Sequence, residues 1–271
     1  MHIESTKALP QHAGQMLRRR LSTAEVFPFV GVYDAFSAAI ASRHFEGLFV
    51  SGFSFSASFY GLPDIGLIGW PDVVAYVQRL RALLPQALLL VDLDDGYADV
   101  EVACHVTRLL EQAGAAGLVL EDQDRPKRCG HLGGKRILDL ETHLERLRGV
   151  LAARRDLFVV ARTDASDRAE VLRRVRAFAA EGADAVLVDG LSDLDFLREI
   201  AGSVPCPVVL NVVSGGKMQP VTMQDAARAG ARIMFQSTTC LFAVHSALEE
   251  AVLALRESAF AHGGSTSTLA L

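Results

Sequence analysis

Short apolar runs alternate along the chain with longer segments in which apolar residues recur every three or four positions. The short runs have the length of strands, and the longer segments have the period of amphipathic helices. We predict strands at residues 27–32, 47–50, 87–93, 116–120, 157–161, 183–188, 207–212 and 232–235. Strands that alternate with helices in this way are expected to run parallel.

Eight parallel strands with intervening helices close most simply into a (β/α)8 TIM-type barrel, so the predicted class is α/β. We expect one barrel domain over residues 1–271, with an N-terminal helical segment, a core at about 25–258 and a short polar C-terminal tail. The helical windows at 144–151 and 171–179 would cover the outside of the barrel. A doubly wound open sheet is the alternative.

Composition and charge argue against several classes of function. With 271 residues, half of them hydrophobic, the chain can bury one large core. Its net charge of -5 and its scattered basic residues argue against nucleic acid as a partner. No apolar run is long enough to span a membrane. Four cysteines without a CxxC pair, and a first segment unlike a signal peptide, predict a cytoplasmic protein with reduced thiols.

Carboxylates stand where two buried strands are predicted to end. Asp92 and Asp94 close one apolar run and Glu121 closes the next. Acids beside low-dielectric core repel each other unless a cation neutralises them, so we predict a Mg²⁺ site, with Mn²⁺ as an alternative. Asp92 and Asp94, two apart on an extended segment, should project to the same side. Asp64 is a further candidate for the metal site, although the sequence of its loop is also typical of an ordinary turn.

In a barrel, the residues at the strand ends share one face. Arg162 ends an apolar run, where a guanidinium needs an anion. That anion is either the carboxylate of a small-molecule substrate or an internal partner, Asp164 or Glu121. Ser51 and Gly52 offer a hydroxyl and amides to a carboxylate, or simply form a turn.

The loop at residues 124–135 carries further chemistry. Cys129 lies between Arg128 and the pair Gly130 and His131, so positive charge should favour its thiolate and make it usable as an acid or base. Glycines on this loop suit a lid that closes over substrate. Zinc is the competing interpretation, but a tetrahedral site needs further Cys or His ligands, and none is grouped with these in the sequence.

Several motifs carry a family resemblance, and they occur in the family's order over roughly residues 29–251. They are Tyr33 to Ala38, Ser51-Gly52, Gly61 to Asp64, Asp92 to Tyr97, Glu121 to Gln123, Pro126 to His131, Ala161 to Ala165 and Asn211. Together they resemble the isocitrate lyase and phosphoenolpyruvate mutase superfamily. The segment KRCGH is similar to its methylisocitrate lyase, dimethylmalate lyase and carboxyphosphonoenolpyruvate mutase branches.

The resemblance implies a Mg²⁺-dependent carbon–carbon lyase for a 2-methylisocitrate-like or alkylmalate-like 2-hydroxyacid, in a homo-oligomer, dimer or tetramer. It implies that Asp92 binds the metal directly, and that Asp64, Asp94 and Glu121 act through water. Cys129 would transfer a proton, assisted by Lys127, Arg128, His131 and Arg162. The implied substrate contacts are Tyr33, Ser51, Gly52, Phe53, Asp92, Gly130, Arg162, Asp189, Asn211 and Ser214.

Two departures concern the distal half of the substrate. Asp189 stands where the lyases commonly have Glu, and Ser214 stands where nearer relatives have another Glu. The alternatives are therefore an oxaloacetate hydrolase or decarboxylase, an enzyme of phosphonate phosphorus–carbon bonds, and a weakened barrel that only binds a dicarboxylate.

The proposed role of Cys129 is testable by substitution. If its thiol transfers a proton, Cys129→Ser should lower kcat by roughly a hundredfold or more, while the circular dichroism spectrum stays that of the parent. Retention of most of the activity on the best substrate would remove the thiol from the mechanism.

Overall fold

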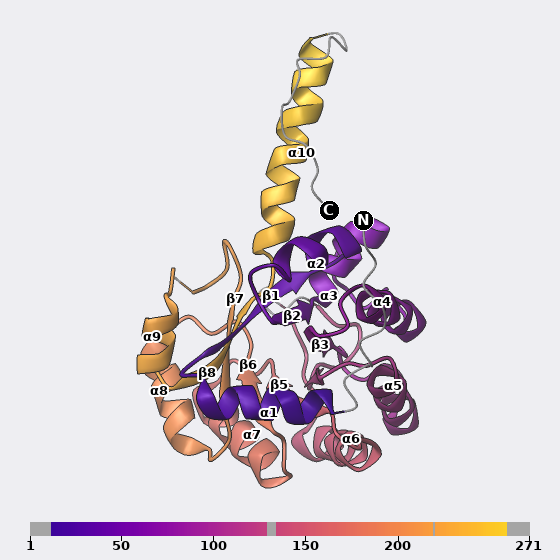
Figure 1. The fold of residues 1–271 in the computed structure, drawn as a ribbon. Coiled ribbons are helices and arrows are strands. Elements are labelled where there is room, and N and C mark those ends of the chain that lie inside the picture. Colours follow the sequence, from indigo (N-terminus) through magenta and orange to yellow (C-terminus); the bar gives the residue numbers. More distant parts are fainter. Residues whose placement is uncertain (1–11, 129–133, 219, 259–271) are drawn as a thin grey trace.

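The computed structural model describes residues 12–128, 134–218 and 220–258. Its centre is a closed barrel of parallel strands in sequential order, as Figure 1 shows. The strands are β1 (Phe27–Val32), β2 (Gly47–Val50), β3 (Leu88–Asp92), β4 (Gly117–Glu121), β5 (Phe158–Thr163), β6 (Ala185–Val188), β7 (Val208–Val212) and β8 (Ala231–Gln236). The predicted TIM-type barrel is confirmed, and the open sheet is excluded.

Helices follow the strands around the outside. They are α1 (Ala13–Thr23), α2 (Ala35–Ala41), α3 (Gly52–Phe55) with the π-helical turn η1 (Ser56–Tyr60), α4 (Trp70–Leu83), α5 (Val100–Gln112), α6 (Leu140–Ala153), α7 (Arg168–Ala180), α8 (Leu194–Ser203), α9 (Met223–Arg228) and α10 (Thr239–Glu257). The two predicted helical windows are α6 and α7, whose apolar stripes are buried against the barrel. Aspartates cap α5, α6 and α7 by accepting backbone N–H groups.

The inside of the barrel follows the two-residue period of its strands. Alternate residues such as Phe49, Leu90 and Val160 form one buried cluster inside the barrel, while the residues between them pack under the helices. Helix α1 adds Leu17 and Leu21 to the inner cluster and so closes the amino-terminal end of the barrel. The interior is therefore a packed core and not a pore.

At the carboxyl ends of the strands, the same period continues into polar residues. The next inward positions are Ser51, Asp92, Glu121, Arg162, Asp189, Asn211 and Ser237. Our predicted strand ends at residues 120 and 161 are wrong, because Glu121 still belongs to β4 and Arg162 still belongs to β5. Backbone groups form the hydrogen bonds between neighbouring strands, so a strand can continue through a polar residue.

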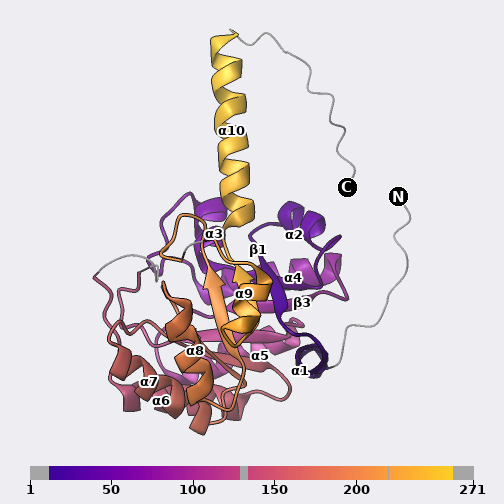
Figure 2. The ribbon, with the colours of Figure 1, turned by 90° about the vertical axis from the view of Figure 1, so that its left-hand side faces the viewer.

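Helix α10 leaves the barrel and extends away from it, as Figures 1 and 2 show. None of its 19 residues is buried. Within residues 12–128, 134–218 and 220–258, no helix combines the length and the hydrophobicity of a membrane span.

Candidate active site at the carboxyl ends of the strands

A small cavity of about 50 Å³ opens at the carboxyl ends of the strands. It brings together seven residues that the sequence analysis selected: Ser51, Phe53, Asp64, Asp92, Arg162, Asp189 and Asn211. Ser237 and Thr238 also line it and were not predicted. Ser237 could have been found by continuing the two-residue period of β8 beyond Phe235.

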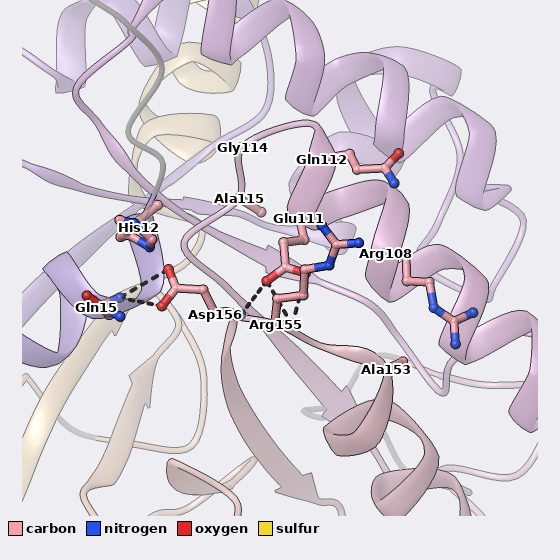
Figure 3. Close-up of a pocket in the computed structure, with 11 residues that line it drawn as sticks. His12, Gln15, Arg108, Glu111, Gln112, Gly114, Ala115, Ala153, Arg155 and Asp156 are labelled. Carbon is pink, nitrogen blue, oxygen red and sulfur yellow. Dashed lines mark hydrogen bonds between the residues drawn. The ribbon is translucent and has the colours of Figure 1, made fainter.

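A larger cavity, of about 590 Å³, lies near the start of α1 (Figure 3). Its carboxylates already have structural tasks. Asp156 accepts the backbone N–H groups of Gly14 and Gln15 at 2.8 and 3.1 Å, and Glu111 accepts those of Arg155 and Leu157 at 3.1 and 3.0 Å. This cavity is a joint between α1 and the turns before β4 and β5, so we place the active site at the other end of the barrel.

Asp92 is the last residue of β3 and is held by backbone amides. Its carboxylate accepts N–H groups from Gly52 and Asp94, each at 3.3 Å. A Cβ on residue 52, at the start of α3, would lie 3.0 Å from Asp92 Oδ2 and 3.3 Å from Asp94 Oδ1, so glycine lets the backbone approach both acids without displacing them. We had expected Asp94 to lie on an extended segment. Instead, it lies in a turn with φ of 53°. The two acids are close because the chain turns, not because of strand alternation.

Lys127 reaches into this acidic group from the loop after β4. Its side chain is 1% exposed, and its Nζ forms ion pairs with Asp64 Oδ1 at 3.0 Å and with Asp94 Oδ1. The stem of Lys127 packs against Gly66, which has φ of 76° and where a Cβ would lie 2.9 Å from Lys127 Cγ. The loop before α4 and the loop after β4 are thus joined at the metal candidates.

Arg162 is paired internally. Its Nε donates to Asp164 Oδ2 at 2.9 Å, and its Nη2 lies 2.8 Å from Asp189 Oδ2 and 3.2 Å from Glu121 Oε2. Lys135 also pairs with Asp164, at 2.7 Å. The internal partners that the sequence left as an alternative are therefore present. They fix the plane of the guanidinium at the edge of the cavity.

A polar chain joins β6, β7 and the end of β8. The amide Nδ2 of Asn211 donates to Asp189 Oδ1 at 2.8 Å, and the hydroxyl of Ser237 donates to Asn211 Oδ1 at 2.5 Å. Ser214 is exposed, and its backbone N–H donates to the hydroxyl of Thr238 at 3.3 Å. The neighbouring Val213 lines the cavity in its place.

Other predicted residues lie apart from this cavity or outside the described residues. Tyr33 is buried, and its hydroxyl donates to the carbonyl oxygen of Cys240 at 3.5 Å. Cys129, Gly130 and His131 are outside the described residues. At the base of their loop, the exposed Arg128 exchanges two hydrogen bonds of 2.8 Å with the side chain of Gln123.

The balance between burial and neighbouring charge shifts the pKa values of these acids in opposite directions. Burial and the charge of Asp94 raise the pKa of Asp92 to about 6. Burial also raises the pKa of Glu121 well above its usual value, despite Arg162 and Lys127. Although burial opposes it, Arg162 and Lys135 lower the pKa of Asp164 to about 2. Asp92 and Glu121 therefore lack sufficient positive charge in the protein alone, whereas Asp164 has it.

The donor set fits a hydrated divalent cation. Both carboxylate oxygens of Glu121 are buried and accept no hydrogen bond within the described residues. In the same part of the chain, no three His, Cys, Asp or Glu side chains converge as a ready-made metal cage. Mg²⁺ commonly uses one or two carboxylates and keeps several waters, so a single direct ligand with acids around its water shell matches this geometry.

The opposite pKa shifts predict opposite effects on stability. In metal-stripped protein at pH 8, Asp92→Asn should raise the free energy of unfolding by up to about 3 kcal/mol, because the folded state raises the pKa of Asp92 by about two units. The gain should disappear near pH 4, where Asp92 is protonated in the folded state. Asp164→Asn is the matched control and should destabilise the protein at pH 8. Urea unfolding measures both, and a loss of stability in Asp92→Asn at pH 8 would contradict the assignment.

Comparisons with known proteins identify the family of this chain. A family model described as phosphoenolpyruvate phosphomutase matches residues 17–256. The petal death protein of Dianthus caryophyllus is 36% identical over 84% of this chain and 73% of its own length. A 2-methylisocitrate lyase of Aeropyrum pernix is 30% identical over 91% of this chain and 81% of its own.

Solved structures extend the likeness to the whole fold. A 2,3-dimethylmalate lyase superposes with a TM-score of 0.90 at 30% identity, covering 95% of this chain and 89% of that one. An oxaloacetate acetylhydrolase bound to 3,3-difluorooxalacetate also gives 0.90 at 30% identity, covering 95% and 90%. A phosphonopyruvate hydrolase in complex with oxalate and Mg²⁺ gives 0.81 at 25% identity, covering 92% and 88%. With its closed barrel and the family match over residues 17–256, this chain belongs to the phosphoenolpyruvate mutase and isocitrate lyase superfamily.

Proposed function

We propose that this chain is a Mg²⁺-dependent carbon–carbon lyase that cleaves a substituted 2-hydroxy di- or tricarboxylate into a 2-oxoacid and a carboxylic acid. The observation that carries the proposal is the set of hydrogen-bond partners of Asp92. Among the described residues it accepts only backbone N–H groups, while Lys127 pairs with Asp64 and Asp94, and Arg162 contacts Glu121. Asp92 is thus the acid left for direct contact with a cation, as the resemblance implies.

The bound ion would polarise the substrate's 2-oxygen and stabilise the negative charge that develops there. The residues of the chain would bind and orient the substrate. Arg162 uses Nε and Nη2 for its internal partners, so its remaining donors can hold a substrate carboxylate. Ser51, whose hydroxyl oxygen caps α3, and Asn211 flank the same cavity.

Cleavage needs one proton at a defined place. The 2-hydroxyl passes its proton to water as its oxygen becomes the carbonyl of the 2-oxoacid. The bond between the carbons breaks, and its electron pair passes to the departing acid. We propose that Cys129 supplies the proton to that carbon, with Lys127, Arg128 and His131 stabilising charge as the loop approaches.

The distal part of the substrate would lie toward β6 and β7. Asp189 lines the cavity there and is held by Asn211 and Arg162. A shorter acid than the usual Glu leaves more room at this position. The named relatives include an oxaloacetate acetylhydrolase and a phosphonopyruvate hydrolase, so oxaloacetate hydrolysis is the second candidate and phosphonate chemistry the third.

A parallel substrate panel tests the function. With Mg²⁺ present, we expect the highest kcat/KM for 2-oxoacid formation from 2-methylisocitrate or an alkylmalate, and no turnover after EDTA or in Asp92→Ala. Loss of oxaloacetate and phosphate release from phosphonopyruvate are measured alongside. A higher kcat/KM on either of those compounds would contradict the lyase assignment. Ligand binding without turnover of any compound would favour the weakened barrel.

We also propose that α10 packs against a second copy of this chain. Val244, Leu248, Val252 and Leu255 recur every three or four residues and are 36%, 60%, 62% and 38% exposed. They form one apolar stripe on a helix that has left its barrel. A second copy offers the same apolar stripe, so the two surfaces match in chemistry.

Disruption of this stripe should change the molar mass. Light scattering after size exclusion should give a multimer for the parent and a smaller species for the double variant Leu248→Asp, Val252→Asp. Glu250→Lys, on the polar side of the same helix, is the control and should leave the mass unchanged. A monomeric parent would contradict this proposal.

A further inference from the structure

Lys127 occupies the centre of the acidic group that the proposed ion would enter. Its Nζ lies 3.0 Å from Asp64 Oδ1 and also pairs with Asp94 Oδ1, and its side chain is almost fully buried at 1% exposure. A lysine is seldom buried in this way without paired acids. In the structure of the chain alone, its ammonium is therefore the cation that neutralises these two carboxylates.

The same oxygens are those that would receive the water shell of a divalent ion. Asp64 and Asp94 are the acids to which the family resemblance gives water-mediated contacts, and Asp94 lies beside Asp92. An ammonium and a hydrated divalent ion both donate hydrogen bonds to carboxylates, and they repel each other at short range. Both cannot hold these positions without a cost to binding.

We infer that Lys127 is the built-in counter-cation of the metal site, and that a divalent ion binds by exchange with its ammonium. This inference rests on the proposed metal-dependent function. When the ion enters, the ammonium leaves Asp64 and Asp94. Because the Lys127 side chain packs against Gly66, its departure would also remove this contact between the two loops.

Lys135 provides an internal comparison. It is also a largely buried lysine near the cavity, with a side chain 13% exposed, but it pairs with Asp164. Asp164 belongs to the group held by Arg162 and is not a metal candidate. Removing the charge of Lys135 should therefore leave the metal affinity unchanged, whereas removing that of Lys127 should not.

Binding of Mn²⁺ to metal-stripped protein, followed by electron paramagnetic resonance of the free ion, tests the inference without an activity assay. Lys127→Gln keeps hydrogen-bond donors but loses the charge, and it should bind Mn²⁺ at least tenfold more tightly than the parent. Lys127→Met should do the same, and Lys127→Arg, which keeps the charge, should stay near the parent. Lys135→Gln should match the parent.

Thermal unfolding keeps the test decisive if a variant is unstable without metal. Metal-stripped Lys127→Met should melt below the parent, and Mn²⁺ should raise its melting temperature by more than it raises that of the parent. Equal or weaker Mn²⁺ binding by Lys127→Gln would overturn the exchange while leaving the proposed function intact. Absence of Mn²⁺ binding in the parent and in every variant would overturn the metal-dependent function itself, and the exchange with it.

Discussion

The mouth of this barrel depends on the pairing of buried cations with strand-end carboxylates. Lys127 pairs with Asp64 and Asp94, and Arg162 pairs with Asp164, Asp189 and Glu121. Without these contacts, acids this close together in a low-dielectric site would repel each other strongly. The pairing is uneven, because Asp92 accepts backbone amides alone within the described residues. We propose that this unevenness would direct a divalent cation to Asp92.

The barrel places these groups by simple geometry. Inward residues alternate along each strand, so the apolar cluster inside the barrel is continued at the carboxyl ends by polar side chains. Gly31 takes the inward position of β1, where a Cβ would lie 2.1 Å from the carbonyl oxygen of Ser237. Catalytic candidates from separate strands therefore meet without long loops. Helix α1 closes the opposite end of the barrel, so the residues at that end contribute to the stability of the fold.

The sequence predicts the barrel well because its strands and helices have clear periods. Strand β5 nevertheless continues to Thr163, since Arg162 and Thr163 pair with β6 through their backbones whatever their side chains. The cavity set was largely predictable from acids and polar residues at the ends of apolar runs. The left-handed turn at Asp94 and the pairing of Lys127 with Asp64 were not, because local turn geometry and contacts between distant loops leave no periodic signal.

The central claim is that Asp92 is the direct ligand of a divalent ion that carries the substrate's oxygens. A crystal structure of the protein with Mg²⁺ and oxalate tests it most directly. We expect an ion at about 2.0–2.1 Å from a carboxylate oxygen of Asp92. Oxalate should complete its coordination, and one oxalate carboxylate should lie within hydrogen-bond distance of Arg162. An ion bound elsewhere, or oxalate held in the barrel mouth with Asp92 still on backbone amides alone, would contradict the account.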